Sequence, residues 1–137
     1  MSVSRTDDIA LCQSLRARVF TDEQGVSQAD EVDGADGDAI HFLAELDGMS
    51  VGTARILLKG DTAKIGRVCV LKDARGTHQG QALMVACIEW ARANDFRRCV
   101  LGAQLDAMGF YEKLGFVAFG DVFNDAGIDH RNMEMTL

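Results

Sequence analysis

A short loop ahead of a long apolar helix is the segment of this sequence with the clearest capacity for chemistry. The loop reads Arg75-Gly76-Thr77-His78-Gln79-Gly80, and a mostly apolar stretch, 82–91, follows it. The first amides of a helix have no partner inside the helix and lie at the positive end of its dipole, so a phosphate can bind there. Glycines let that phosphate approach the main chain. The loop has neither the Gly-Lys-Ser/Thr end of a Walker loop nor the GxGxxG dinucleotide fingerprint. We interpret it as a candidate phosphate site, with an ordinary tight turn as the alternative.

Periodicity predicts the elements that position this loop. Apolar residues at helical spacing, with a cap at Thr6 and a stop at Gly115, predict helices over 7–20, 81–94 and 107–114. Extended segments separated by turn residues such as Asp47-Gly48 predict strands over 41–46, 49–58, 63–71, 98–103, 116–119 and 132–137. The order strand, helix, strand over 63–103 implies a parallel strand pair joined by a right-handed crossover.

Length and composition favour one domain, 1–137, with its own core. The chain has 137 residues, of which 47% are hydrophobic and 26% are charged. A chain of this size buries enough surface to fold without metals or disulfides. No stretch approaches the roughly 20 apolar residues that span a bilayer, and the first residues lack a secretion signal, so we expect a cytoplasmic protein with no membrane partner.

The charge argues against nucleic acid as a partner. Twenty-one acidic against fourteen basic residues give a net charge of −7, the wrong sign for binding a polyanionic backbone. A negative field favours cationic small molecules or basic peptides, and it also serves solubility. The acidic stretch 27–38 could be a solvated loop or short helix, or it could line a site for a positive substrate.

The remaining reactive side chains do not form a recognisable metal or nucleophile pattern. The cysteines have no CxxC spacing and the histidines no HExxH spacing, so we expect buried thiols in a reducing compartment and no metal; these residues are Cys12, Cys69, Cys87, Cys99, His41, His78 and His130. Gly48-Met49-Ser50-Val51-Gly52 matches the GxSxG nucleophile elbow, but a strand follows Ser50 where that elbow requires a helix. We interpret the serine as part of a hairpin, and a hydrolase that uses Ser50 stays an alternative.

Two motifs together resemble one family. Arg75-Gly76-Thr77-His78-Gln79-Gly80 resembles the Gln/Arg-x-x-Gly-x-Gly/Ala pyrophosphate loop of the GCN5-related N-acetyltransferases, the GNAT family. Phe110-Tyr111-Glu112-Lys113-Leu114-Gly115-Phe116 is similar to the family's signature near the second cofactor-contacting helix. The segments 19–26, 39–42, 51–55, 65–68 and 125–130 resemble the small bacterial ElaA/YjcF-like branch. The resemblance covers the chain from about Arg16 onward.

The resemblance implies an α/β (α+β) fold that binds acetyl-CoA. This GNAT-like acyl-CoA N-acyltransferase fold has a mixed, mostly antiparallel sheet, a central splayed parallel strand pair and flanking helices. Amides from about His78 to Ala82, with Arg75 nearby, would hold the pyrophosphate, and the backbone of Val68 and Val70 would pair with the pantetheine arm. The cofactor-binding residues implied in this way are Val68, Cys69, Val70, Arg75, Gly76, Thr77, His78, Gln79, Gly80, Gln81, Ala82 and Gln104.

The transfer reaction then makes two chemical demands. An amine must lose a proton before it attacks, and the departing thiolate must be stabilised or protonated. Tyr111, the only tyrosine, stands where the family places its general acid; a core tyrosine with a satisfied hydroxyl is the alternative. For the proton acceptor and the acceptor-binding residues, the sequence offers only candidates, which are Glu23, Gln24, Glu31, Asp33 and His130.

Three positions depart from the family pattern. His78 replaces the first loop glycine, and we expect the phosphate cradle to survive if the φ angle there is negative. Gln104 stands where many members have Asn before the second helix. Only six residues precede the first helix, so the opening strand should be short or missing and one sheet edge less covered; a homodimer could cover it.

We therefore predict an N-acetyltransferase that moves an acetyl group from acetyl-CoA directly to a primary amine of a small molecule or to an exposed amino group. A non-catalytic acyl-CoA-binding or sensing domain on the same fold is the main alternative. Cys69 is the obvious thiol for a route through a covalent intermediate, but its place inside a strand favours a core role.

Overall fold

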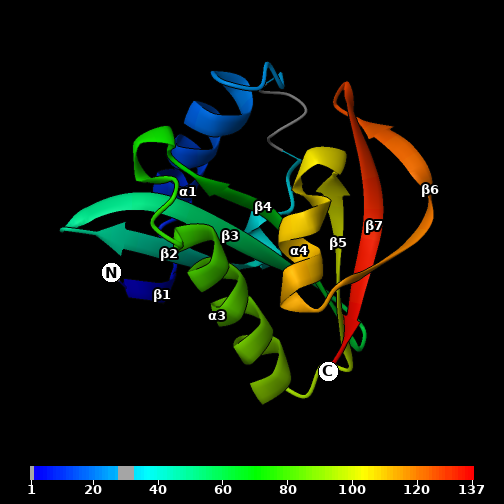
Figure 1. The fold of residues 1–137 in the computed structure, drawn as a ribbon. Helices are drawn as coiled ribbons and strands as arrows, with labels where there is room; N and C mark the ends of the chain where they lie inside the picture. Colours follow the sequence, from blue (N-terminus) through cyan, green and yellow to red (C-terminus); the bar gives the residue numbers. More distant parts are fainter. Residues whose placement is uncertain (1, 28–32) are drawn as a thin grey trace.

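A seven-stranded mixed sheet forms the centre of the molecule, with the strand order β1-β2-β3-β4-β5-β7-β6 (Figure 1). The computed structural model describes residues 2–27 and 33–137. In these residues the strands are β1 (Ser2–Thr6), β2 (Ile40–Leu46), β3 (Met49–Lys59), β4 (Thr62–Val70), β5 (Arg98–Gln104), β6 (Val117–Asp125) and β7 (Ile128–Thr136). The helices are α1 (Ile9–Arg16), α3 (Gln79–Ala93) and α4 (Met108–Leu114), with short helical turns η1 (Ala17–Thr21), η2 (Asp36–Asp38), η3 (Lys72–Ala74) and η4 (Leu105–Ala107).

The parallel pair that the sequence predicts lies at the centre of the sheet. β4 and β5 are parallel, and their register has three residue pairs, which end at Lys64 opposite Val100. Beyond that point β4 stays paired with β3 and β5 with β7, so the two central strands diverge. This divergence is the predicted splay, and the predicted mixed, mostly antiparallel sheet is confirmed.

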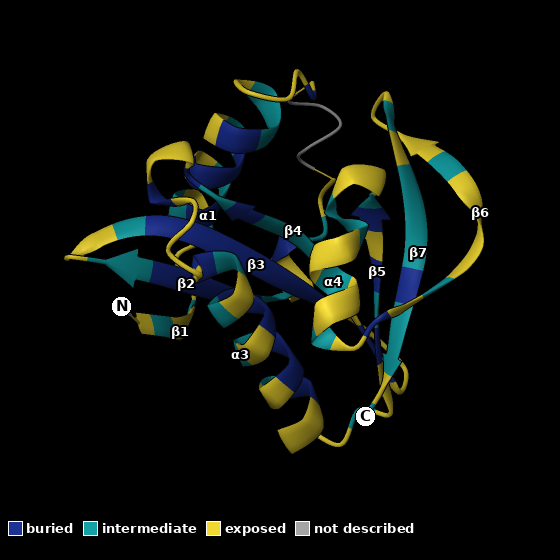
Figure 2. Cartoon of the chain, in the orientation of Figure 1, coloured by how far each residue is buried: buried dark blue, intermediate teal, exposed yellow. Residues whose placement is uncertain are grey.

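Helices cover the two faces of the sheet with separate apolar clusters. On one face α3 packs Leu83, Met84 and Cys87 against sheet residues such as Ile56. On the other face α1 and η1 pack Leu15 and Val19 against a smaller cluster that includes Cys69 and Leu71. Figure 2 shows buried residues concentrated in β3, β4 and the inner side of α3, while β6 at the sheet edge is mostly exposed.

The ends of the chain differ most from the expected elements. β1 is short, as expected, but not missing, and it pairs with β2 from Ser2 opposite Glu45 to Thr6 opposite His41. β6 and β7 are longer than the predicted 116–119 and 132–137, because Ala126 and Gly127 both have positive φ angles (53° and 82°) and close a tight hairpin. The first helix is also interrupted, since the turn Ala17–Thr21 is a π-helix.

Candidate active site

A small cavity opens where β4 and β5 diverge. It encloses about 220 Å³ and lies between strand, turn and helix residues. Its lining residues are Phe20, Gln24, Ile65, Gly66, Arg67, Val68, Leu101, Gly102, Gln104, Ala107, Tyr111 and His130. Four residues that the sequence singles out therefore share this cavity with Val68 of the splayed strand: Gln24, Gln104, Tyr111 and His130.

Tyr111 reaches the cavity from α4. Its ring lies edge-on to Phe110 and Phe116, at centroid distances of 5.0 and 6.2 Å. No described group forms a hydrogen bond with its hydroxyl, so the alternative of a core tyrosine with a satisfied hydroxyl has no support in the described residues. Burial raises the pKa of Tyr111 to about 12, with a smaller contribution from Cys87. The phenol therefore stays protonated near neutral pH and can donate a proton inside the cavity.

His130 lines the same cavity, and its ring is held in place by two contacts. Its Nδ1 lies 2.7 Å from the carbonyl oxygen of Ile128. A carbonyl can only accept, so Nδ1 carries the proton and donates it, which leaves the Nε2 lone pair unused by that contact. The ring stacks on Phe123 at a centroid distance of 5.7 Å, which fixes its plane.

Two glutamines brought together from distant segments close one end of the cavity. The Gln104 Nε2 donates a hydrogen bond of 2.9 Å to the Gln24 Oε1. Gln104 was predicted to contact the cofactor, but here it lies beside Tyr111 and His130 and ties β5 to the segment after η1. The contact leaves the amide NH2 of Gln24, with two donors, and the amide oxygen of Gln104 for a bound molecule.

The predicted phosphate loop borders a second, larger cavity. This cavity encloses about 620 Å³. The predicted cofactor residues in its lining are Val70, Arg75, Gly76, His78, Gln79, Gly80 and Gln81, and the other lining residues are Ala74, Ala107, Phe110 and Lys113. The first intrahelical bond of α3 runs from the Ala82 amide to the His78 carbonyl, at 3.0 Å. Ala82 was predicted to offer its amide to the pyrophosphate, and this is wrong because that amide is already bonded. The open amides at this end are those of residues 79–81.

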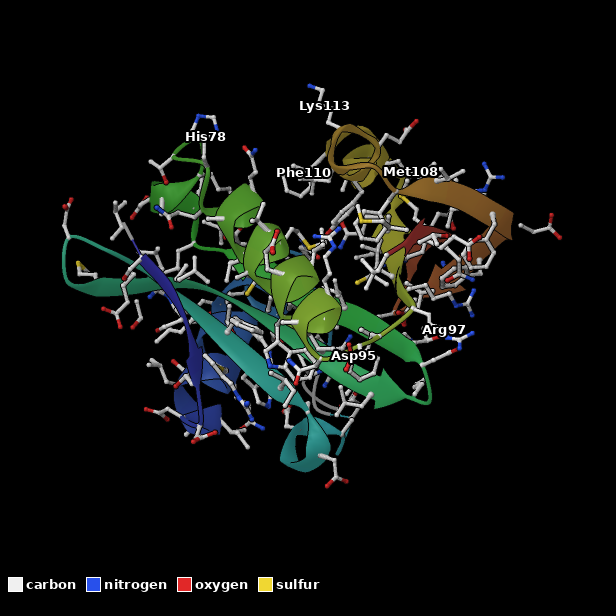
Figure 3. All side chains as sticks on the ribbon, turned by 90° about the horizontal axis from the view of Figure 1, so that it is seen from below. His78, Asp95, Arg97, Met108, Phe110 and Lys113 are labelled. Carbon is white, nitrogen blue, oxygen red and sulfur yellow. The ribbon has the colours of Figure 1, made fainter. Side chains whose placement is uncertain are left out.

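Gly80 lies where α3 and α4 come close together. A Cβ built on Gly80 would lie 3.6 Å from the Cζ of Phe110, in ordinary van der Waals contact that fills the space between α3 and α4. Figure 3 shows Phe110 on the side of α4 turned toward α3, with His78 on the loop that precedes α3. The open amides and this gap fit a diphosphate group with an extended arm.

The condition that we placed on His78 is not met. His78 has a φ angle of +64°, in the left-handed region, and not the negative value that we required. Histidine adopts this conformation more readily than most residues. The loop therefore holds a residue with a Cβ in a backbone conformation that favours glycine, at the cost of strain.

The acidic residues predicted as acceptor contacts are held by arginines. Arg75 bridges the Val70 carbonyl (Nε, 3.0 Å) and the Glu23 carboxylate (Nη2, 2.8 Å), so Glu23 lies beside the phosphate loop and does not line the Tyr111 cavity. Asp33 accepts two hydrogen bonds from Arg55, at 2.9 and 2.8 Å. Those bonds outweigh the effect of burial and lower the pKa of Asp33, which makes it a poor proton acceptor. Glu31 lies outside the described residues.

The other candidate centres of chemistry are accounted for by packing. Cys69 is buried in the cluster under α1, Ser50 lies within β3, and Thr77 bonds the Ala74 carbonyl. Among residues 2–27 and 33–137, no three side chains of His, Cys, Asp or Glu gather into a group that could hold a metal ion. No helix in this part of the chain is long and apolar enough to cross a membrane.

Comparison with known proteins places the chain in a family. The sequence profile described as "Acetyltransferase (GNAT) domain" matches residues 10–137, so the chain belongs to the GNAT acetyltransferases. It is 32% identical to the uncharacterized N-acetyltransferase YjcF of Bacillus subtilis, over 87% of this chain and 86% of that protein. It is 36% identical to ElaA of Escherichia coli K12, over 87% of this chain and 81% of ElaA. These relatives confirm the ElaA/YjcF-like branch.

Solved structures confirm the fold. The crystal structure of Escherichia coli ElaA matches with a TM-score of 0.87 and 30% identity, over 98% of this chain and 99% of that one. An acyl-CoA N-acyltransferase from Pseudomonas aeruginosa matches with a TM-score of 0.86 and 29% identity, over the same shares.

Sequence reasoning missed several residues that line the two cavities. Phe110 and Lys113 follow Ala107 at intervals of three, which places all three on one face of α4, and that spacing was a usable signal. Phe20 and Arg67 had no such signal. Arg67 reaches the smaller cavity from an irregular part of β4, where its φ angle is +51°.

Proposed function

We propose that this chain is an N-acetyltransferase that moves an acetyl group from acetyl-CoA directly to a primary amine. The observation that carries the proposal is the Tyr111 hydroxyl, which lies without a described partner in a 220 Å³ cavity at the splay of β4 and β5. Family membership supports acyl transfer. The identity of the acetyl donor, the amine acceptor and the direct route are the parts that we propose.

The phosphate loop is suited to hold the donor. The open amides of residues 79–81 and the Arg75 guanidinium would bind the pyrophosphate, and the unpaired edge of β4 around Val68 would bind the pantetheine arm. Bound acetyl-CoA would supply an activated thioester. Arg75 would then exchange all or part of its contact with Glu23 for the diphosphate.

The cavity residues divide the proton transfers between them. We assign the Nε2 of His130 as the group that takes a proton from the acceptor ammonium. We assign the phenol hydroxyl of Tyr111 as the group that donates a proton to the departing sulfur. One C–N bond forms and one C–S bond breaks. The ammonium loses two protons on its way to the amide. His130 takes the first and later passes it to water, and the second, released from the nitrogen as the C–S bond breaks, returns through water to the Tyr111 oxygen. The Gln24–Gln104 pair would orient the amine.

Tyr111→Phe tests this assignment by removing one oxygen. We expect CoA release, followed with a thiol reagent over a panel of amines, to fall by about 10²- to 10⁴-fold, the usual share of a general acid. CoA binding, measured by calorimetry, should change little because Tyr111 does not line the larger cavity. Ser50→Ala, which also removes one hydroxyl, is the matched control and should keep full turnover.

The same assay separates the alternatives. A chain that binds CoA and releases none with any amine would be an acyl-CoA-binding domain without catalysis. Turnover by Tyr111→Phe equal to wild type would refute the role of the phenol. Loss of turnover in a folded Cys69→Ala variant would support a covalent route in place of direct transfer.

A further inference from the structure

The acceptor side of the sheet carries a second concavity next to the Tyr111 cavity. It encloses about 360 Å³, and we call it the basic groove; its lining is Lys59, Thr62, Lys64, Arg98, Val100, Leu101, Phe119 and Asn132. The groove and the Tyr111 cavity share Leu101. Nothing in the proposed function assigns a ligand to it.

The two concavities lie end to end on one face of the sheet. Residues directly opposite each other in a sheet share a face. Gln104 is opposite His130 and Gly102 is opposite Asn132, while Lys64 is opposite Val100. Going back along β5 from Gly102, Val100 lies about 7 Å away and Arg98 about 13 Å away, at the usual rise of a strand. The groove therefore continues from the reaction cavity along β4 and β5.

The charge of these linings is opposite to that of the whole chain. Four of the residues that line them are basic, and none of the described lining residues is acidic; the four are Lys59, Lys64, Arg67 and Arg98. Arg67 and Arg98 already face carboxylates, those of Asp33 at 3.4 Å and Glu134 at 2.9 Å, so the excess positive charge comes from Lys59 and Lys64. The chain as a whole has a net charge of −7. A positive concavity on an acidic protein attracts and holds anions locally.

The three cations of the groove differ in how they are held. Thr62 and Glu134 fix the Arg98 guanidinium, through its Nε at 3.0 Å and its Nη1 at 2.9 Å. Lys59 and Lys64 form no hydrogen bond or ion pair with a described group. Partial burial lowers the pKa of Lys64, as do Lys59, Arg55 and Arg67, against the opposing charge of Asp125. Positive charge thus outweighs negative charge around the Lys64 amine.

The junction of the two concavities is apolar. A Cβ on Gly102 would lie 3.3 Å from the Cζ of Phe123, so the Phe123 ring lies over the strand at this point, whereas the Leu101 side chain belongs to the core cluster under α3. Methylene groups suit such surroundings better than charged ones.

From this arrangement we infer that the acceptor is an amine with an oxyanion, carboxylate or phosphate, at the far end of a short apolar linker. The amine would lie beside Tyr111 and His130, and the oxyanion in the groove beside Lys64 and Arg98. The inference rests on the proposed function for the position of the amine. It reverses the cationic acceptor that the acidic stretch suggested. Of the described acids in that stretch, Asp33 and Asp36 are held by Arg16, Arg55 and Arg67, and Asp38 is exposed outside the lining of either concavity.

A ladder of synthetic acceptors tests the inference. The probes are ω-amino carboxylic acids and ω-amino phosphates of increasing length, with the neutral amino amides and the cationic diamines of equal length as comparisons. We expect the lowest KM for an anionic probe at an intermediate length, and we expect added salt to raise that KM more than the KM of the amide. The carboxylate and phosphate arms identify the oxyanion.

Lys64→Gln and Arg5→Gln form the matched pair of variants. Replacing Lys64 removes no hydrogen bond or ion pair with a described group. Arg5 is an exposed cation on β1, which lies at the edge of the sheet away from the groove. We expect Lys64→Gln to raise the KM of the anionic probe about three- to fivefold relative to that of the amide, with kcat little changed, and Arg5→Gln to change neither.

Two results would overturn the inference alone: a preference for the diamines or amides, or an equal effect of Lys64→Gln on all probes. If no probe is turned over, the proposed function fails. The inference can still be tested, because calorimetry on the CoA-loaded protein measures binding of the same probes. Equal binding of the amino amide and the amino carboxylate would then refute it, and tighter carboxylate binding that Lys64→Gln removes would support it.

Discussion

Asp36 holds together a buried ionic network, and its removal should cost much of the protein's stability. Its carboxylate accepts from Gln13 at 2.9 Å, from Arg16 at 2.8 Å and from Arg55 at 3.2 Å. The Arg16 side chain is 0% exposed, and its Nε already has no partner. Asp36→Ala would leave this guanidinium buried without its anion, which costs about 3 to 5 kcal/mol. Domains have only about 5 to 15 kcal/mol in total, so the variant should unfold at a much lower urea concentration.

The pH dependence of that loss gives a second, independent magnitude. Burial by itself would raise the pKa of Asp36, but the hydrogen bonds from Gln13 and Arg16 outweigh it and lower the pKa from 3.8 to about 2. A carboxylate with a lowered pKa contributes stability that is fully present above pH 3.8 and is lost as the pH falls to about 2. The shift corresponds to about 2 kcal/mol. The stability gap between wild type and Asp36→Ala should therefore narrow by about 2 kcal/mol across this window.

Urea unfolding followed by the fluorescence of the single tryptophan, Trp90, measures both magnitudes. Asp38→Ala is the matched control, because Asp38 lies in the same turn, is exposed and has no described ion pair. Asp38→Ala also removes one carboxylate, so any change in stability at low pH that comes from net charge alone is the same in both variants. A gap that stays constant from above pH 3.8 down to pH 2 would refute the reasoning, and so would a control that loses as much stability as Asp36→Ala.

Three further predictions concern single side chains. Both amide atoms of Gln79 are buried without a partner, so Gln79→Met should raise the free energy of unfolding by about 1 to 2 kcal/mol; a lower urea midpoint would contradict this. His78 has a φ angle of +64°, so His78→Gly should be more stable than His78→Ala by about 1 kcal/mol, and the reverse order would show that the loop is not held in this conformation. Because Tyr111 is the only tyrosine, the absorbance of tyrosinate reports on it alone, and it should appear near pH 12 in the folded protein and near pH 10 in urea. Its raised pKa means that stability is lost as the pH rises from 10 toward 12, and a native titration near 10 would place the phenol in water.

The elements that position the site could be predicted because their signals are local. The loop from Arg75 to Gly80 lies beside its helix in the sequence, and the Asp47-Gly48 turn lies between the two strands that it joins. The Phe110–Phe116 signature likewise carries Tyr111 on one short helix that ends at Gly115. In each case the residues that determine the structure are within a few positions of one another, where periodicity and turn chemistry act.

The partners within the site could not be predicted because they are distant in the sequence. Gln104 meets Gln24 across 80 positions, and Arg75 meets Glu23 across 52. Neither pair belongs to a helix repeat or a strand register, so spacing carries no information about it. The sequence nominated Gln24, Gln104 and Glu23 by type, and the fold then placed the two glutamines in the Tyr111 cavity and the glutamate beside the phosphate loop.

Net charge and the lining of the basic groove point to acceptors of opposite sign. A total of −7 describes the field far from the protein, whereas a bound acceptor meets only the charges that line its cavity. Asp33 and Asp36 form ion pairs with Arg16 and Arg55, and their carboxylates are mostly buried against the protein. Along β4 and β5 the proposed acceptor would meet Lys59 and Lys64, which have no hydrogen-bond or ion-pair partner among the described residues, whereas Arg67 and Arg98 are paired with Asp33 and Glu134. The sign of a site must therefore be taken from the residues that line it and from the partners those residues already have.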